Sequence, residues 1–482
     1  MFATTCEART RSLFLLLSLM LVSVCLVGCG EIPEMKFASH PRVDELMPPA
    51  QEVVKSTIDK HFGEPDAIVA WSKLPVEFGM LEGEVTEIKD GAKDGQKTLT
   101  VELDETEVDL QGDTLEFYRE DEETGEDVAD FLRVLSYDAE SGTLVASGEN
   151  FPEEESEIFV GGHGLKDGQR LYMKHCLHCH GVTGDGDGPT ANYLNPKPRD
   201  FRLGLFKYKS TDYAEKPSHA DLMRTLDEGI AGTYMPSFKL LEEDEKKAIV
   251  EYVRWLSMRG EIEKRLIDFF EAEFSILAWE ETQEEGEEAM EGLKLDFQDI
   301  VVEELPFELD AVASQIGRKW ELADDESSLV KPTVARVADT QESRLRGQKY
   351  YVSSKCITCH GPLGYGDGSE TETYKTDPLT NVTYSEPGLY DAWGTLVKPR
   401  NLRLGQFRGG RRPIDVFRRI KGGIPGTPMQ AFSTSLKDEE IWDVVNYVLS
   451  LPHSDPAVEI NQRANLETTD TSKSSLAGSE GE

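Results

Sequence analysis

A duplicated segment constrains this chain of 482 residues more than any other feature. Residues 176–181 read Cys-Leu-His-Cys-His-Gly, and residues 356–361 read Cys-Ile-Thr-Cys-His-Gly. Three further motifs recur in the same order: Gly-Asp-Gly (186–188, 366–368), Lys-Pro-Arg-x-x-Arg-Leu-Gly (197–204, 398–405) and Gly-Thr-x-Met (232–235, 426–429). Each copy closes with an amphipathic helix, predicted over 242–258 and 437–451. One domain has therefore been duplicated.

The Cys-x-x-Cys-His motif in each copy is the signature of covalent haem attachment. The two thiols add across the haem vinyl groups, and the adjacent histidine reaches the iron from the same turn of chain. The predicted sets are Cys176 and Cys179 with His180, and Cys356 and Cys359 with His360. The sequence therefore predicts two haem c groups.

Two other chemistries use paired cysteines. A zinc ion takes its four ligands from two Cys-x-x-Cys pairs, but zinc leaves the adjacent histidines and the repeated methionines without a role. A disulfide framework suits an oxidising compartment, but four cysteines in about 450 residues make a poor scaffold. Both alternatives explain less of the repeat than haem does.

A methionine is the predicted second axial ligand in each copy. Met429 is the only methionine between His360 and the final helix, where no further histidine occurs. In the first copy Met235 occupies the matching position, whereas Met223 and Met258 fall in helical patterns typical of packing residues. A thioether ligand suits an electron carrier, because it raises the reduction potential of the iron. We therefore predict Met235 and Met429 as ligands.

With these motifs, each copy resembles a class I (mitochondrial-like) cytochrome c domain, over residues 161–260 and 341–453. The resemblance implies an all-α domain in which a first helix ends in the haem motif and a last helix crosses it. It also implies a proline that hydrogen-bonds the axial histidine, for which Pro198 and Pro399 are the best matches. That bond would fix the ring orientation and tune the iron.

Four arginines recur beside these prolines. A guanidinium matches a carboxylate in a bidentate way, so they are candidates for the haem propionates. A role in local structure or at the solvated surface is the alternative. The four are Arg199, Arg202, Arg400 and Arg403.

The copies differ in length between the haem motif and this arginine region. The interval from Cys179 to Arg199 is 20 residues, and that from Cys359 to Arg400 is 41. The second copy therefore carries an insertion near residues 369–396, which could cover a haem edge, contact a partner or be filler. The histidines outside the haem motifs, including His219, are expected at the surface.

The net charge of −40 is unevenly distributed. Residues 161–260 hold 15 basic and 14 acidic side chains, and residues 341–453 hold 15 and 12. Residues 30–160 hold 10 and 35, and residues 261–340 hold 7 and 23. The acidity argues against nucleic acid as a partner, and it lies outside the two haem repeats.

The remaining segments predict a multidomain chain. Residues 30–74 are expected to be a tether with one helix over 50–62. Residues 75–160 alternate polar and apolar side chains in short stretches, which predicts a small N-terminal all-β domain, a barrel or a sandwich. Residues 261–340 are predicted to be an acidic helical linker, and residues 454–482 a disordered tail.

Residues 1–29 have the features of a secretory leader. Arg9 and Arg11 precede an apolar stretch that is short for a membrane-spanning helix. The stretch ends in Leu-Val-Gly-Cys29, which resembles a bacterial lipobox. The resemblance implies a diacylated Cys29 that tethers the mature chain to a membrane; an uncleaved anchor helix is the alternative. Either arrangement places the chain on the extracytoplasmic, periplasmic side.

Together these features predict a membrane-anchored dihaem electron carrier rather than an enzyme. Its partners would be a redox donor and a redox acceptor of a respiratory chain. Two alternatives remain: a haem-bearing subunit of a larger oxidase or dehydrogenase, and a dihaem peroxidase. A peroxidase needs an iron with an open coordination position, and a methionine at the matching place in both copies argues against it.

Overall fold

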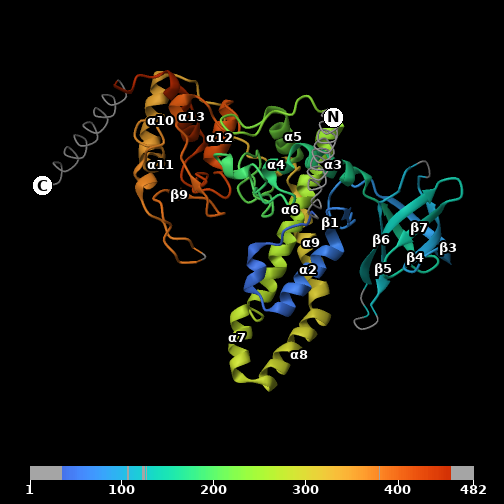
Figure 1. Cartoon of the computed structure of the whole chain (residues 1–482). Helices are drawn as coiled ribbons and strands as arrows, with labels where there is room; N and C mark the ends of the chain where they lie inside the picture. Colours follow the sequence, from blue (N-terminus) through green and yellow to red (C-terminus); the bar gives the residue numbers. More distant parts are fainter. Residues whose placement is uncertain (1–34, 106–107, 122–124, 126, 379, 458–482) are drawn as a thin grey trace, which may run out of the picture. The chain divides into compact units, whose positions relative to one another are not determined.

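The computed structural model describes residues 35–105, 108–121, 125, 127–378 and 380–457 (Figure 1). The described residues from Ala38 onward belong to one compact unit. The predicted leader, with Cys29, and all but the first residues of the predicted tail lie outside the described residues. Within the described part of the chain, no helix combines the length and the apolar character needed to cross a membrane.

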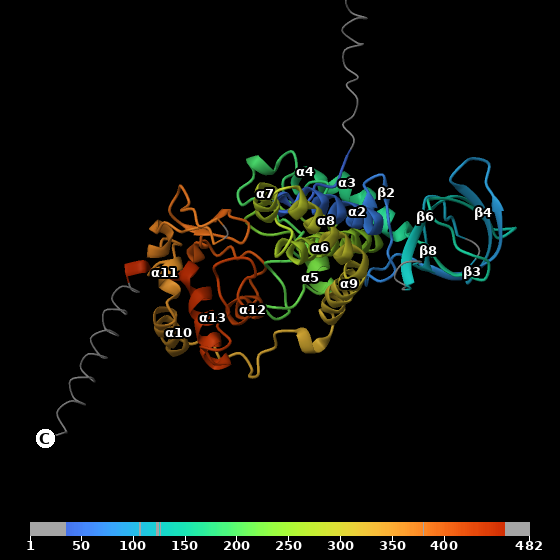
Figure 2. The same ribbon diagram turned by 90° about the horizontal axis from the view of Figure 1, so that it is seen from below.

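A closed antiparallel barrel follows the N-terminal segment (Figures 1 and 2). Its order is β3-β4-β7-β6-β5-β8, and every second residue of a strand points inward to an apolar core that includes Val85, Leu99, Phe117 and Leu144. The all-β prediction is thus confirmed, and the barrel is the form it takes. The strands are β3 (Leu81–Asp90), β4 (Gln96–Leu103), β5 (Thr114–Glu120), β6 (Asp127–Asp138), β7 (Thr143–Ser147) and β8 (Glu157–Gly161).

The segment before the barrel is not a free tether. A short 3-10 turn, η1 (Pro41–Glu45), leads into helix α2 (Pro48–Phe62), which packs against helix α6 (Glu243–Glu271). The ring of Phe62 lies 5.5 Å from that of Trp255 on α6. A small hairpin of β1 (Gly63–Glu64) and β2 (Ala67–Ile68) follows. This segment therefore belongs to the packing of the first repeat.

The first repeat consists of helices around a haem motif. Helix α3 (His163–His175) ends at the motif, crosses α6, and is followed by the short helix α4 (Leu177–His180). Gly168 makes this crossing close, because a Cβ atom there would collide with the backbone of Ala248. The repeat also contains η2 (Ala191–Tyr193) and α5 (His219–Glu228).

Helix α6 corrects the predicted boundary at residue 260. The sequence predicted a last helix over 242–258 and a linker that begins at 261, but α6 runs unbroken for 29 residues across that boundary. Gly260 does not end the helix, because it is the point at which Arg202 packs closest: a Cβ atom there would lie 2.5 Å from the Arg202 Cα. The last helix of the repeat and the first helix of the predicted linker are therefore one element.

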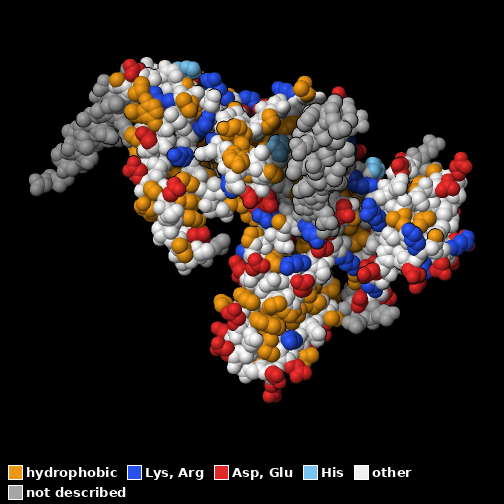
Figure 3. All heavy atoms as spheres, in the orientation of Figure 1, with side chains coloured by type: hydrophobic (Ala, Val, Ile, Leu, Met, Phe, Trp, Pro, Cys, Tyr) orange, Lys and Arg blue, Asp and Glu red, His pale blue; other side chains and the backbone are white. Residues whose placement is uncertain are grey.

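The rest of the acidic linker is helical, as predicted. Helix α9 (Leu305–Leu322) packs back against α6, and α8 (Glu287–Glu303) packs against both α7 (Ile276–Glu285) and α9. Figure 3 shows acidic side chains over the barrel and around α7 and α8, where hydrophobic side chains are also exposed. Leu277 on α7 and Leu295 on α8 keep 66% and 54% of their surface in solvent. A turn, η3 (Glu326–Ser328), leads to the second repeat.

The second repeat has the same plan. Helix α10 (Gln341–Ser353) precedes the haem motif in α11 (Cys356–His360) and packs against the last helix, α13 (Asp438–Ser450) (Figure 2). Gly347 lies at this crossing, against the backbone of Asp443. The other elements are η4 (Ser369–Glu372), β9 (Leu389–Tyr390), β10 (Leu396–Val397), η5 (Leu402–Leu404), α12 (Pro413–Lys421) and η6 (Leu451–His453).

Candidate haem sites

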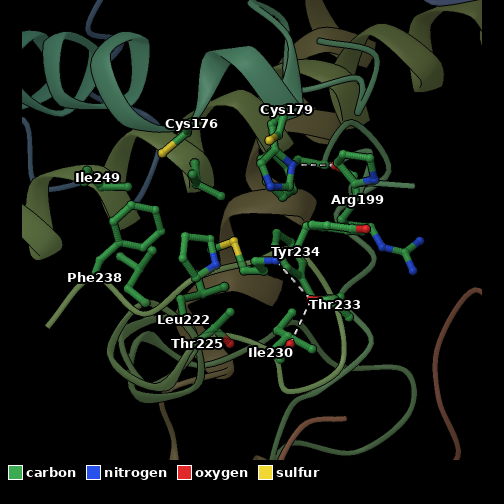
Figure 4. Close-up of a pocket in the computed structure, with 18 of the residues that line it drawn as sticks. Cys176, Cys179, Arg199, Leu222, Thr225, Ile230, Thr233, Tyr234, Phe238 and Ile249 are labelled. Carbon is green, nitrogen blue, oxygen red and sulfur yellow. Dashed lines mark hydrogen bonds between the residues drawn. The ribbon is translucent and has the colours of Figure 1, made fainter. Parts of the chain in front are cut away.

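The first repeat encloses a cavity of about 460 Å³, within the range of cofactor sites. Its lining is mainly apolar and includes both thiols of the haem motif, His180 and Met235. In Figure 4 Cys176 and Cys179 enter from one side, and Thr225, Ile230 and Thr233 lie across from them. The cavity therefore brings together, from segments nearly 60 residues apart, the four side chains that the repeat singled out. Its apolar walls fit a macrocycle.

The thiols are available for covalent attachment. Burial raises the pKa of Cys176 to about 12 and that of Cys356 to about 11, so both are neutral thiols. The four motif cysteines are free thiols in the structure. Among the described residues no cluster of three or more His, Cys, Asp or Glu side chains has the arrangement of a metal site.

His180 is held by a backbone carbonyl. Its Nδ1 lies 3.0 Å from the carbonyl oxygen of Arg199, so Nδ1 carries the proton and Nε2 the lone pair. Phe201 stacks on the ring at 4.6 Å between centroids. Burial lowers the pKa of His180 to about 4, which keeps the imidazole neutral. A neutral ring with Nε2 free of the proton is the form that binds iron.

The acceptor carbonyl is not the predicted one. The resemblance assigned this hydrogen bond to Pro198 and Pro399, but in both repeats the following arginine accepts it. His360 Nδ1 lies 3.2 Å from the carbonyl of Arg400, and burial lowers the pKa of His360 too. Each proline instead stands before the acceptor, where its restricted backbone favours the extended conformation of the segment.

Met235 sits in a tight loop across the cavity from the thiols. The Ile230 amide donates to the Met235 carbonyl at 3.1 Å, and the Thr233 hydroxyl donates to the Ile230 carbonyl at 2.8 Å. The same hydroxyl accepts from the Met235 amide at 3.1 Å. Thr233 therefore fixes the backbone that carries the thioether. That Met235 binds iron stays a prediction.

The second repeat builds the same loop. The Ile424 amide donates to the Met429 carbonyl at 2.9 Å, and Thr427 makes both hydroxyl contacts. Met429 and Cys356 pack together on the core of this repeat. The arrangement of the first site is thus repeated in its thiols, its carbonyl-bound histidine and its methionine loop.

Two of the four candidate arginines serve local structure. Arg202 forms a bidentate ion pair with Asp200, at 3.1 Å from Nε and 2.9 Å from Nη2. Arg403 donates to the backbone carbonyls of Leu363, Leu451 and Ser454. Both guanidiniums therefore serve local structure, the alternative that the sequence left open for them, and a propionate role for either stays a prediction.

The other two arginines lie beside the opposite repeat. Arg199 is one of the residues that line the first cavity (Figure 4). Its guanidinium stacks 3.9 Å over the ring of Trp393. Trp393 belongs to the insertion of the second repeat, so the insertion contacts the edge of the first site. Arg400 donates to the backbone and side chain of Gln406 at 2.8 and 3.0 Å. Both remain compatible with a propionate role.

Sequence reasoning missed two side chains that line the first cavity, Tyr208 and Arg408. Arg408 comes from the second repeat, about 230 residues from the haem motif that it approaches. The alignment of the copies held a signal, because Lys207 and Arg408 occupy the same place three residues after the Leu-Gly of their motif.

His219 is not the surface residue that was expected. Its Nδ1 lies 2.5 Å from an Asp324 carboxylate oxygen, and its Nε2 lies 2.6 Å from one of Glu251. These hydrogen bonds, led by the one to Asp324, raise the pKa of His219 to about 9. His219 therefore joins the start of α5 to α6 and to the segment after α9.

Comparison with known proteins agrees with this geometry. Residues 165–257 and 345–452 each match the cytochrome c family model, which indicates covalently bound haem c and haem-based electron transfer. No curated protein matches the chain. Among solved structures, it is similar to a chain of the reducing HAO-like protein complex of Kuenenia stuttgartiensis, with 25% identity, 59% of this chain and 96% of that chain covered, and a TM-score of 0.40. A TM-score this low supports no structural argument.

Proposed function

We propose that this protein is a membrane-anchored dihaem cytochrome c of class I type, with one His/Met haem in each repeat. It passes single electrons between extracytoplasmic respiratory partners and is a carrier rather than an enzyme. The observation that carries the proposal is the first cavity, where two thiols, a neutral histidine and a methionine loop converge.

The haem supplies reversible one-electron chemistry at its iron. The chain's own residues set the conditions for it. The Arg199 and Arg400 carbonyls orient the axial histidines, and the Thr233 and Thr427 hydroxyls hold the methionine loops. Held ligands move little when the charge of the iron changes, and an apolar cavity excludes water. Both properties favour fast electron transfer over bond chemistry.

The anchor and the compartment rest on the leader. A lipidated Cys29 would keep the haem repeats beside the membrane and restrict their encounters to partners in or near it. Cytochrome c domains are typically extracytoplasmic, which agrees with an exported chain. The acidic barrel and the acidic α7–α8 region offer surfaces for orientation or docking. The haem repeats are nearly neutral, so they can exchange electrons with partners whose surface carries either positive or negative charge.

A redox titration with a ligand test examines the proposal. The purified full-length protein should contain two haems, and each should resist carbon monoxide in the ferrous state. Met235→His and Met429→His should each lower one midpoint potential, because imidazole favours ferric iron more than a thioether does. Met258→Leu is the matched control, since Met258 is fully buried in α6 and should leave both potentials in place.

Three results would contradict the proposal. Rapid carbon monoxide binding at either haem would indicate an open iron and favour a peroxidase. Unchanged potentials in both histidine variants would overturn the ligand assignment. Stable co-purification with other subunits from detergent-solubilised membranes would favour a fixed place in a larger oxidase or dehydrogenase.

A further inference from the structure

The two repeats meet through equivalent surfaces. The Arg199 Nη1 lies 3.8 Å from the Cβ position of Gly426, in the methionine loop of the second repeat. Its counterpart Arg400 has Nη2 2.6 Å from the Cβ position of Gly232, in the methionine loop of the first. Reciprocal contacts between matching positions are the mark of a two-fold interface. The repeats therefore pack as an internal pseudo-dimer, with the haem-bearing loops facing each other.

Tyr208 and Gly409 mark the centre of this interface. They occupy matching positions in the two copies, four residues after the Leu-Gly of the repeated motif. A Cβ atom at Gly409 would lie 2.5 Å from the Tyr208 ring, and Gly409 has a φ of +75°. A tyrosine in both copies would collide, so one copy supplies the ring and the other the space for it.

Four arginines surround Tyr208: Arg199, Arg400, Arg408 and Arg419. Burial raises the pKa of Tyr208, and the charges of all four act in the opposite direction. Their contacts are with neutral groups: Arg199 with Trp393, Arg400 with Gln406, Arg408 with the Gly232 carbonyl and Arg419 with the Gly410 carbonyl. Burial lowers the pKa of Arg199 and of Arg419 to about 10.

The nearest carboxylates are committed to other cations. Asp391 lies 3.5 Å from Lys207, and Asp415 lies 3.0 Å from Arg224 and 2.9 Å from Arg412. A partly desolvated cluster of guanidiniums costs free energy unless anions join it. Among the described residues, the carboxylates near these arginines are therefore shared with other cations, and the interface favours additional negative charge.

Arg408 points to where that charge lies. Its Nε is buried and has no hydrogen-bond partner among the residues that the structure describes, and its side chain lines the cavity of the first repeat together with Arg199. A haem in this cavity brings two propionates. Because a guanidinium pairs with a carboxylate through parallel N–H donors, an orphaned Nε beside such a group is satisfied by it.

We propose that Arg408, supplied by the second repeat, binds a propionate of the haem in the first repeat together with Arg199. The inference rests on the proposed function, since it requires the haem. It makes the first haem site incomplete without the second repeat. The edge of the haem that bears the propionates then faces the second repeat, which favours electron exchange within the chain.

The test is a redox titration of the haem-loaded, full-length protein with Arg408→Gln. Loss of a nearby positive charge favours ferric iron, so the midpoint of the first haem should fall while that of the second keeps its value. This midpoint potential should also become more dependent on pH, because the propionate loses the positive charge of Arg408 that favours its ionised form. In Arg408→Lys the midpoint potential of the first haem should fall less, because lysine keeps the positive charge but not the paired N–H donors of the guanidinium.

Arg411→Gln is the matched control, because it removes the same charge from an exposed position three residues away. The component that Met235→His moves identifies the first haem in each titration. Haem content is measured beforehand: fewer than two haems in the wild type would refute the proposed function, and this inference with it. With two haems present, a shift in Arg408→Gln no larger than in Arg411→Gln, or a shift of the second haem alone, would overturn only the inference. Should Arg408→Gln fail to fold, the shift in Arg408→Lys is compared with that in Arg411→Lys, which keeps the charge at the exposed control position.

Discussion

The two repeats are nearly identical where they face the cofactor and different where they face the rest of the chain. The Tyr172 hydroxyl donates to the Gly181 carbonyl at 2.8 Å, and Tyr351 makes the same bond to Gly361 at 2.8 Å. The histidines of the haem motifs bond to arginine carbonyls in both copies, and the methionine loops share three internal hydrogen bonds. The contacts retained in both copies therefore hold the haem motif and the methionine loop.

The surroundings have diverged. The first repeat is packed against α2 and α9, and its last helix continues for 14 residues, about four turns, beyond the matched region. The second repeat ends with α13 and instead carries the insertion whose Trp393 covers Arg199. The first repeat thus differs from the second by a longer last helix, and the second differs from the first by an inserted loop. The interiors of the two repeats have kept the same hydrogen bonds at the haem motif and the methionine loop.

The largest expected effect separates the two sites by haem content. Replacing both motif thiols of one repeat, Cys176→Ala with Cys179→Ala or Cys356→Ala with Cys359→Ala, should remove covalent attachment there and leave one haem instead of two. Mass measurement of the denatured protein counts the haems. Leu177→Ala and Ile357→Ala, between the thiols, should keep both. Retention of two covalently bound haems in either double variant would contradict the assignment.

The next effect tests whether the helix crossings are equivalent. Gly168→Ala and Gly347→Ala should each lower the free energy of unfolding by about 1–3 kcal/mol, because the added methyl group meets the backbone of the crossing helix. Chemical denaturation measures this loss. Gly292→Ala on α8, where a methyl group meets nothing within 4 Å, should instead stabilise by about 0.5–1 kcal/mol. A large difference between Gly168→Ala and Gly347→Ala would show that the crossings are not equivalent.

The features that could be predicted from the sequence are those set by residues that lie close together along the chain. The haem motifs, the methionine loops and the two-residue alternation of the barrel each depend on neighbouring residues. The predictions were wrong where the same residue type can serve two structural roles. Gly260 suggested the end of a helix, but it serves the close approach of Arg202. Pro198 suggested the acceptor, but the next carbonyl is the one that faces His180.

The remaining features depend on pairing over long separations. Arg408 reaches a cavity whose haem motif lies in the other repeat, and His219 finds acids 32 and 105 residues away. No local pattern carries such partners. The two-fold contact could not be predicted from the sequence either. Its one trace is that Tyr208 and Gly409 occupy matching positions, so that a large side chain in one copy faces a residue without a side chain in the other.

A smaller effect measures that two-fold contact. Gly409→Ala should cost about 1 kcal/mol, because it adds a methyl group against the Tyr208 ring at a left-handed backbone position. Tyr208→Ala should remove the collision but not the backbone strain. In a double-mutant cycle the two changes should therefore cost less together than the sum of the single changes, by about 0.5 kcal/mol or more. Strict additivity would mean that the repeats do not touch there in solution.

A comparably small effect is a dependence on pH that only the first repeat should show. His219 has a pKa of about 9 in the folded protein, raised chiefly by Asp324, against about 6.5 when unfolded. Its stabilising effect is complete below pH 6.5 and is lost as the pH rises through 9, so the free energy of unfolding should fall across that window. The side chain is 37% exposed, so solvent reduces the loss to about 1 kcal/mol.

Unfolding of the wild type and of His219→Gln, followed from pH 6 to 10, tests this dependence. The variant should be less stable than the wild type at pH 6, because glutamine cannot carry the positive charge with which His219 pairs with Asp324 and Glu251. The two proteins should have the same stability near pH 10, where His219 is neutral. His178→Gln, on the exposed side of α4, is the matched control and should follow the wild type. The start of α12 in the second repeat is held by Asp415 with Arg412 and Arg224, whose contacts involve no histidine. An equal pH dependence in His219→Gln and the wild type would therefore remove this distinction between the repeats.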